Sequence, residues 1–312
     1  MQDQARKITH GAMMIALFAI LLALTLYVPV FIIVTIPLLP LPITLYRLRY
    51  DRTSTFAVMA AVSLIALLIG GLLSVPTAVV MALIGFVIGD SIRTGKSKLY
   101  IFMATGLTLL VSLTVLYLGT VWLLKVNPVE QFLEGFGVLQ QEVLKTLADM
   151  SNSTKDVEQM VIDTINYYQT IIPSLFILSV FIMGYLFVMP IMAIAARLQF
   201  EVPKFAPFTN MRLPFATVAV YMVLLLVSIL SQAEQGTTSH LMEANAILIF
   251  RFLFFMQGLA LIYFALQTMK ISGIVKVPVT LFAMFLSPFT VMLGVIDIAI
   301  NVRAWIAKDK RG

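Results

Sequence analysis

An almost unbroken apolar run of membrane-spanning length, residues 11–26, lies near the start of the chain, and comparable runs recur along it. A helix needs about 20 apolar residues to cross the hydrocarbon core of a bilayer. We predict eight spans, at about residues 8–27, 31–46, 55–73, 77–92, 99–124, 171–196, 213–230 and 244–269. With a further apolar stretch at 277–302, the sequence predicts an all-α polytopic membrane protein with eight or nine transmembrane helices.

Composition excludes a soluble globular protein. Hydrophobic residues make up 61% of the chain and charged residues 12%, against about 45–50% and about 25% in soluble domains. The net charge of +6 fits the Lys and Arg excess of cytoplasmic loops, and no basic run with interleaved aromatic residues points to a nucleic acid. The absence of Cys excludes disulfides, thiolate metal sites and a Cys nucleophile.

The distribution of cations predicts the orientation. With a cytoplasmic N-terminus and eight spans, thirteen Lys and Arg fall on the cytoplasmic side and three on the outer side. The thirteen are Arg6, Lys7, Arg47, Arg49, Arg52, Arg93, Lys96, Lys98, Arg197, Lys204, Arg212, Lys270 and Lys276, and the three are Lys125, Lys145 and Lys155. Because cytoplasmic loops carry the excess of cations, we expect the N-terminus inside and residues 198–212 as a cytoplasmic connection.

Two apolar stretches are irregular. Residues 31–46 contain three prolines and reach only about 24 Å as a helix, so we expect a kinked or partly unwound span. Residues 277–302 are broken at Ser287-Pro288. They form either one kinked span or two arms that return the C-terminal cations to the cytoplasm. We favour the single span, because two short arms would need protein to bury their ends.

The segment between the fifth and sixth spans has a different character. Residues 126–170 carry apolar side chains at helical spacing in two parts, split by Ser151-Asn152-Ser153-Thr154. This pattern predicts two amphipathic helices. We expect them to form an outer hairpin that lies on, or caps, the bilayer surface.

The first helix, which starts Gly11-Ala12-Met13-Met14-Ile15-Ala16, and the proline-rich Leu38-Leu39-Pro40-Leu41-Pro42 resemble the YybS-like family of bacterial membrane proteins, over essentially the whole chain. That family is similar, over its first six spans, to the substrate-binding S components of energy-coupling-factor vitamin transporters. The resemblance implies an S-component-like core at 1–197, in the bacterial cytoplasmic membrane. It also implies a separate energy-coupling membrane subunit as partner.

In S components, an Ala-x-x-x-Ala face on the first span docks on the coupling subunit. The matching positions are Ala12 and Ala16, with a second copy at Ala19 and Ala23. Small residues four apart also let helices of one chain pack closely, so internal packing is an alternative. S components end after six spans, whereas here residues 198–312 follow, with two or three further helices expected in 213–312.

Charged residues inside spans are costly and need a partner. Arg251 lies within the eighth predicted span, and Asp297 is the one acid of the last apolar stretch. We expect these two to pair, either as a structural contact or as a substrate or ion site. Asp90 and Arg93 are three residues apart at a helix end and are expected to pair at the interface.

An S component binds its ligand among the outer ends of its spans. The groups available there are Tyr117, Trp122 and Asn127 after the fifth span, and Tyr167 and Tyr168 before the sixth. An aromatic belt at the membrane interface explains the same residues without a ligand.

No catalytic constellation is evident. Ser-rich segments have no nearby His for a triad, no glycine-rich phosphate loop occurs, and His240 with Glu243 is too few ligands for a metal. We therefore expect no enzyme, no cofactor and no metal. The first hypothesis is a small-molecule-binding subunit of a transport system with a separate energy-coupling partner. The alternatives are a membrane scaffold or regulatory protein that docks other proteins, and a carrier that uses the Arg251–Asp297 pair.

Overall fold

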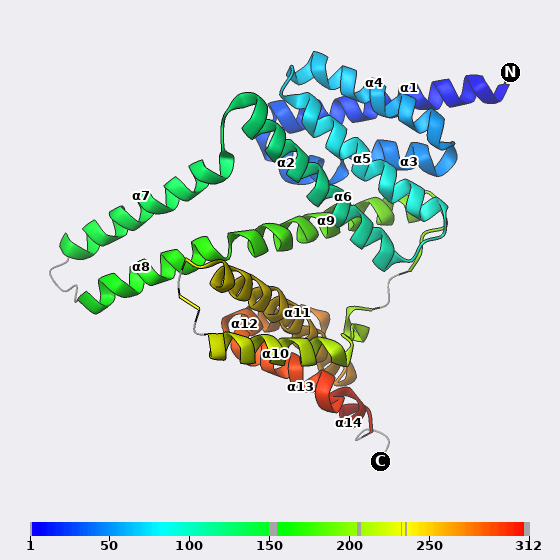
Figure 1. Cartoon of the computed structure of the whole chain (residues 1–312). Coiled ribbons are helices and arrows are strands. Elements are labelled where there is room, and N and C mark those ends of the chain that lie inside the picture. The colour runs from blue at the N-terminus through cyan, green and yellow to red at the C-terminus, as the bar shows by residue number, and fades with distance from the viewer. Residues whose placement is uncertain (1, 150–154, 205–206, 232, 235, 309–312) are drawn as a thin grey trace. The chain divides into compact units, whose positions relative to one another are not determined.

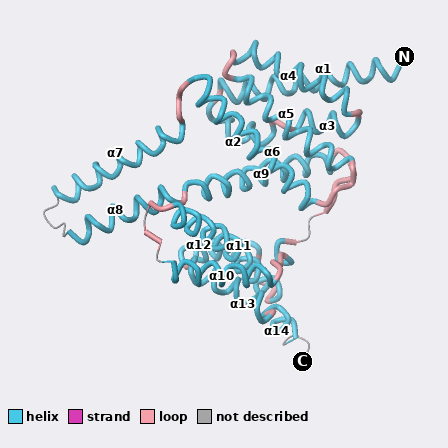
Figure 2. Tube along the Cα trace, in the orientation of Figure 1, coloured by secondary structure: helices cyan, strands magenta, loops and turns pink. Residues whose placement is uncertain are grey.

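The computed structural model describes residues 2–149, 155–204, 207–231, 233–234 and 236–308, and these are helices joined by turns and loops, with no strand among them (Figure 1, Figure 2). The expected all-α architecture is confirmed. Within the described ranges, seven helices are long and apolar enough to cross a membrane, or eight with one bent pair. The chain divides into two units, Met1–Phe132 with Ile177–Lys204, and Leu133–Phe176 with Phe205–Gly312.

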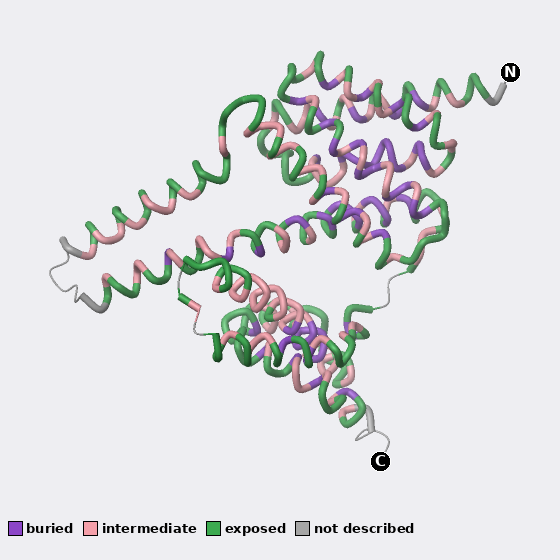
Figure 3. The backbone as a smooth tube through the Cα atoms, viewed as in Figure 1, coloured by how far each residue is buried: buried purple, intermediate pink, exposed green. Residues whose placement is uncertain are grey.

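The first unit contains the N-terminal spans and most of the sixth. Its helices are α1 (Gln2–Tyr27), α2 (Ile32–Leu38), α3 (Leu41–Arg49), α4 (Arg52–Gly70), α5 (Ser74–Arg93), α6 (Lys98–Gly119, continued by a wide turn at Thr120–Leu124) and α9 (Ile172–Arg197). Phe18, Leu22 and Ile43 are fully buried where α1, α3, α4 and α5 meet. The outward faces stay apolar and exposed, as at Leu68, which is 80% exposed (Figure 3). An apolar surface of this kind suits lipid contact.

A glycine brings α3 and α5 into backbone contact. A Cβ atom at Gly85 would lie 2.4 Å from the carbonyl oxygen of Pro40, so only glycine fits there. Thr44 Oγ1 donates to the Gly85 carbonyl oxygen at 2.9 Å. Small residues allow this close approach between helices in a membrane, where apolar burial adds little drive.

The second span is broken as expected, but it is longer than predicted. α2 and α3 are separated at Leu39 and Pro40, and Pro29–Arg49 together form one apolar segment of 21 residues. The predicted end at Tyr46 was wrong because Arg47 and Arg49 belong to the last turn of α3. Cations in a last turn stabilise the negative end of the helix dipole.

The two expected amphipathic helices are present as α7 (Pro128–Asp149) and α8 (Lys155–Thr170); the predicted break at 151–154 lies outside the described residues. Backbone hydrogen bonds run on from α8 into α9, from Ile171 N to Tyr167 O and from Leu175 N to Ile171 O. The helical hydrogen bonding of α8 therefore runs on into the first turn of α9, and the position of the hairpin on the bilayer surface stays a prediction.

The second unit also holds the C-terminal helices. They are α10 (Phe215–Ser231), α11 (Thr238–Thr268), α12 (Lys276–Phe285), α13 (Ser287–Ile300) and α14 (Val302–Lys308). Tyr221 and Phe254 contact each other in their core, with tilted rings whose centroids lie 5.0 Å apart. α11 and α13 meet at two glycines: a Cβ atom at Gly258 would lie 2.0 Å from Thr290 O, and one at Gly294 would lie 2.0 Å from Phe254 O.

The last apolar stretch is a sharply bent pair of helices, a geometry that a broken single span or a re-entrant loop would both show. α12 and α13 bend by 101° at their junction. α11 and α13 cross at Gly258 and Gly294, and beyond this crossing Asp297 bonds to Gln257 and Arg303 lies over the ring of Phe264. These last two contacts advance along both helices, so α13 runs in the same direction as α11 (Figure 1). The C-terminal arm therefore ends level with the end of α11, as in the returning alternative.

Candidate functional site

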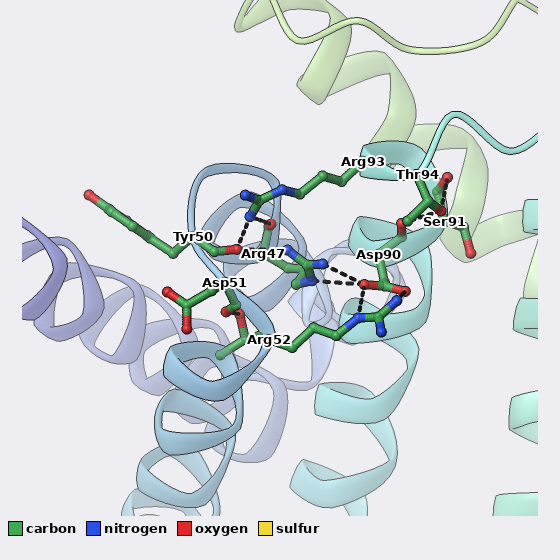
Figure 4. Close-up of polar contacts among 9 residues, drawn as sticks. Arg47, Tyr50, Asp51, Arg52, Asp90, Ser91, Arg93 and Thr94 are labelled. Atoms are coloured by element: carbon green, nitrogen blue, oxygen red, sulfur yellow. Dashed lines mark hydrogen bonds and ion pairs between the residues drawn. The ribbon is translucent and has the colours of Figure 1, made fainter.

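The densest polar cluster of the first unit lies where α3, α4 and α5 end or begin. Asp90 on α5 accepts hydrogen bonds from Arg47 Nε at 3.0 Å and Nη2 at 2.6 Å. It also accepts from Arg52 Nε and Nη2, each at 2.8 Å. Figure 4 shows both guanidinium groups turned toward this one carboxylate. Two cations thus share one anion, and the cluster keeps a net positive charge.

Arg47 is held in place by the close packing of α3 on α5. A Cβ atom at Gly89 would lie 2.9 Å from both Arg47 Cβ and Thr44 O, so this glycine lets α3 approach. The Arg47 side chain is 6% exposed, and its remaining donor, Nη1, bonds to Tyr50 O at 2.7 Å. A buried guanidinium needs this full set of partners.

The expected pairing of Asp90 with Arg93 is wrong. Arg93 instead donates through Nη1 to the carbonyl oxygens of Tyr50 and Arg47 (Figure 4). These carbonyls end α3 and have no partner within the helix. Arg93 therefore caps α3, while the carboxylate is taken by arginines from two other helices.

Asp51 links the N-terminal helix to the start of α4. Its carboxylate accepts from Ser54 N at 3.0 Å, which caps α4, and from Lys7 Nζ on α1 at 2.6 Å. The Lys7 ammonium, and then the Ser54 hydrogen bonds, hold the pKa of Asp51 well below its usual range. The carboxylate is thus ionised at every physiological pH.

Two hollows flank Phe200, just after α9. One, of about 180 Å³, lies between α1, α3 and the end of α9, with His10 and Arg49 in its wall. The other, of about 550 Å³, is more open and includes Arg93, Lys96 and Glu201. The second hollow adjoins the arginine cluster through Arg93, and neither hollow was predicted from the sequence.

The alanines of α1 divide into two kinds. Ala12 and Ala16 are exposed, whereas Ala19 and Ala23 are half-buried. The inward face of α1 is formed by other residues, including Phe18. Within the first unit, Ala12 and Ala16 therefore stay exposed, outside the packed face of α1.

Some of the residues that we expected at an outer ligand site form local contacts instead. Tyr117 Oη donates to Asn127 Oδ1 at 3.2 Å, and the same oxygen accepts from the first backbone N–H groups of α7. Trp122 is exposed. Tyr167 and Tyr168 contact each other edge to face on α8 and line an open hollow of about 550 Å³ on that helix.

The predicted Arg251–Asp297 pair is not formed. Asp297 Oδ2 instead accepts from Gln257 Nε2 at 2.7 Å and from Arg303 Nε at 2.9 Å, and Arg251 is exposed. Asn301, at φ 54°, ends α13 and turns the chain, which brings Arg303 back onto a residue six positions earlier. The turn at Asn301 was not predicted, because the sequence shows only a cationic C-terminal end there. Since Arg303 rather than Arg251 pairs with Asp297, the carrier hypothesis loses the pair on which it was based.

Comparisons with known proteins agree with the sequence and the fold. Residues 16–298 match the model of a family described as a predicted membrane protein, DUF2232. The chain belongs to this family. It is also 24% identical over 307 residues to the uncharacterized protein YybS of Bacillus subtilis (strain 168), covering 96% of this chain and 98% of that protein. The expected YybS-like family is thus confirmed, and no solved structure matches the chain.

Proposed function

We propose that the protein acts without catalysis, by docking another integral membrane protein on the outward face of α1. The observation that carries this proposal is the exposure of Ala12 and Ala16, one turn apart, on a helix whose other face is fully packed. Small side chains let a second helix approach closely in lipid, where dispersion and hydrogen bonding drive association.

The class of partner that we propose rests on the resemblance to S components expected from the sequence. An energy-coupling membrane subunit on this face would make the protein the small-molecule-binding subunit of a transport system in the bacterial cytoplasmic membrane. The open hollow beside Tyr167 and Tyr168 on α8 is the feature that favours a small-molecule cargo. Without cargo, the same docking face would serve a membrane scaffold or regulatory protein.

A photo-crosslinking amino acid at position 16 tests the docking face, and one at Leu64 on α4, which is also exposed, is the matched control. We expect position 16 to give an adduct with one discrete membrane protein, and an added Ala12→Leu substitution to abolish it. Adducts with lipid alone at both positions would contradict docking.

The cargo is tested separately. Mass spectrometry of the protein purified in mild detergent would identify retained small molecules, in the wild type and in Tyr167→Ala and Tyr168→Ala variants. A retained compound that both substitutions remove supports a transport subunit. Docking with no retained compound supports the scaffold.

A further inference from the structure

Phe200 owes its position to the way in which α9 ends. Gln199 has a left-handed backbone, with φ at 64°. Phe200 N bonds to Ala195 O at 3.1 Å, and Gln199 N bonds to Ala196 O at 3.1 Å. This pair of bonds is a Schellman ending, which turns the chain sharply and carries Phe200 back against α3.

The hollow on one side of Phe200 is mostly apolar. It measures about 180 Å³ and opens beside Met13, which is 50% exposed on α1. Its walls are His10, Met13, Met14, Leu45, Tyr46, Arg49, Leu198 and Phe200. A methionine-lined hollow adapts readily to a flexible apolar chain.

One cation stands in the wall of this hollow. Arg49 Nη1 lies 3.1 Å from His10 Nε2 and 3.3 Å from Nδ1. The guanidinium carbon lies 5.5 Å from the centre of the Phe200 ring. The contact with the Phe200 ring and the polar contact with His10 restrain the guanidinium, while Arg49 stays exposed.

The charge of Arg49 is not neutralised by the chain. Among the described residues, no carboxylate oxygen forms an ion pair with it within 4.0 Å. Asp51 pairs with Lys7, and Asp90 with two other arginines. Glu201 lies in the second hollow, together with cations. An anion with an apolar tail would complement both the charge and the hollow.

We propose that this hollow binds one anionic phospholipid, with an acyl chain among the methionines and leucines and the phosphate against Arg49 and His10. Arginine matches phosphate oxygens with paired hydrogen bonds, and basic pockets between membrane helices bind anionic headgroups. The bound phosphate satisfies the free guanidinium donors. The excess of cations at this end of the unit favours an anionic lipid over a zwitterionic one.

The test uses the full chain in mild detergent and native mass spectrometry with dioleoyl phosphatidylglycerol or dioleoyl phosphatidylcholine. We expect the wild type to retain phosphatidylglycerol selectively and Arg49→Gln to bind it about tenfold more weakly or worse. Arg52→Gln is the matched control, because Arg52 is exposed and nearby but lies outside the hollow; it should bind as the wild type does.

Two further measurements keep the proposal testable if Arg49→Gln does not fold. Leu198→Trp fills the hollow without changing charge and should weaken phosphatidylglycerol binding. Glycerol phosphate and inorganic phosphate, which lack a chain, should not compete at concentrations matched to the lipid. Equal binding by the Arg49 and Arg52 variants, equal retention of phosphatidylcholine, or competition by free phosphate would each overturn the lipid site.

Discussion

At the residue scale, Asp90 is the side chain whose replacement has the most direct physical consequence. Asp90→Asn would leave the buried Arg47 guanidinium without its carboxylate, and breaking such a pair costs about 3–5 kcal/mol. Arg52→Ala removes a partner that is 59% exposed and should cost about 1 kcal/mol or less. Unfolding in mixed detergent micelles measures both. If the two variants lost similar amounts of unfolding free energy, burial of Arg47 would not make its ion pair with Asp90 more stabilising than the exposed pair with Arg52.

Asp51 gives a prediction with a defined sign in pH. Its pKa is lowered in the fold, first by Lys7, so its stabilising contribution is complete above its unfolded pKa of about 3.9. The contribution is lost as pH falls below that value toward the folded pKa. The stability difference between wild type and Asp51→Asn should therefore be constant from pH 8 to 5 and shrink below pH 4. A difference that changed between pH 8 and 5 would contradict this assignment.

Sequence spacing identified which residues carry charge in or near the membrane, but not their partners. Spacing along one helix predicts only neighbours on that helix, as with Asp90 and Arg93. One actual partner, Arg47, lies 43 positions from Asp90 in the sequence. The close packing of α3 on Gly89 brings it near, and no local sequence pattern encodes that contact. Asp297 was likewise recognised as needing a cation, while the turn at Asn301 that supplies Arg303 was not.

At the element scale, the crossing of α11 and α13 depends on two glycines. Gly258→Ala would place a methyl group 2.0 Å from Thr290 O, so the helices must separate and the buried bond between Gln257 and Asp297 must stretch. We expect a loss of more than about 2 kcal/mol. Gly135→Ala on α7 meets open space and should be neutral or stabilising, by up to about 1 kcal/mol. Thermal unfolding of both variants in one detergent makes the comparison.

The elements that sequence predicted best are the long, evenly apolar spans, since length and hydropathy define them without tertiary context. Irregularity at prolines was also predicted, within residues 31–46 and at Ser287-Pro288. The direction that the chain takes after each break was not predicted. α12 turns back because α13 packs along α11 through Gly258 and Gly294, and that choice is made by packing rather than by the proline.

At the scale of the whole molecule, cations that are far apart in the sequence lie near one another in the fold. Ten of the thirteen cations that predict a cytoplasmic N-terminus belong to the first unit, where α1, α3, α5 and α9 have their charged ends, and the other three belong to the second unit. Three of them are engaged by Asp51 and Asp90, and Arg49 faces a hollow instead. With the cytoplasmic N-terminus that the positive-inside bias predicts, the proposed lipid site would lie in the cytoplasmic leaflet, where anionic lipids give the surface its negative potential.

The same bias makes a prediction about topology that can be measured cleanly, because the chain contains no Cys and single cysteines have no background. Since α13 returns alongside α11, Ser272→Cys before α12 and Ala304→Cys in α14 should react from the same, cytoplasmic side. Ser239→Cys at the start of α11 should react from outside. A membrane-impermeant maleimide on intact cells should label only position 239, and all three should be labelled after permeabilisation. Labelling of position 304 but not 272 in intact cells would mean that residues 277–302 cross once, and the hinge at Leu286 would then be a kink within a single span.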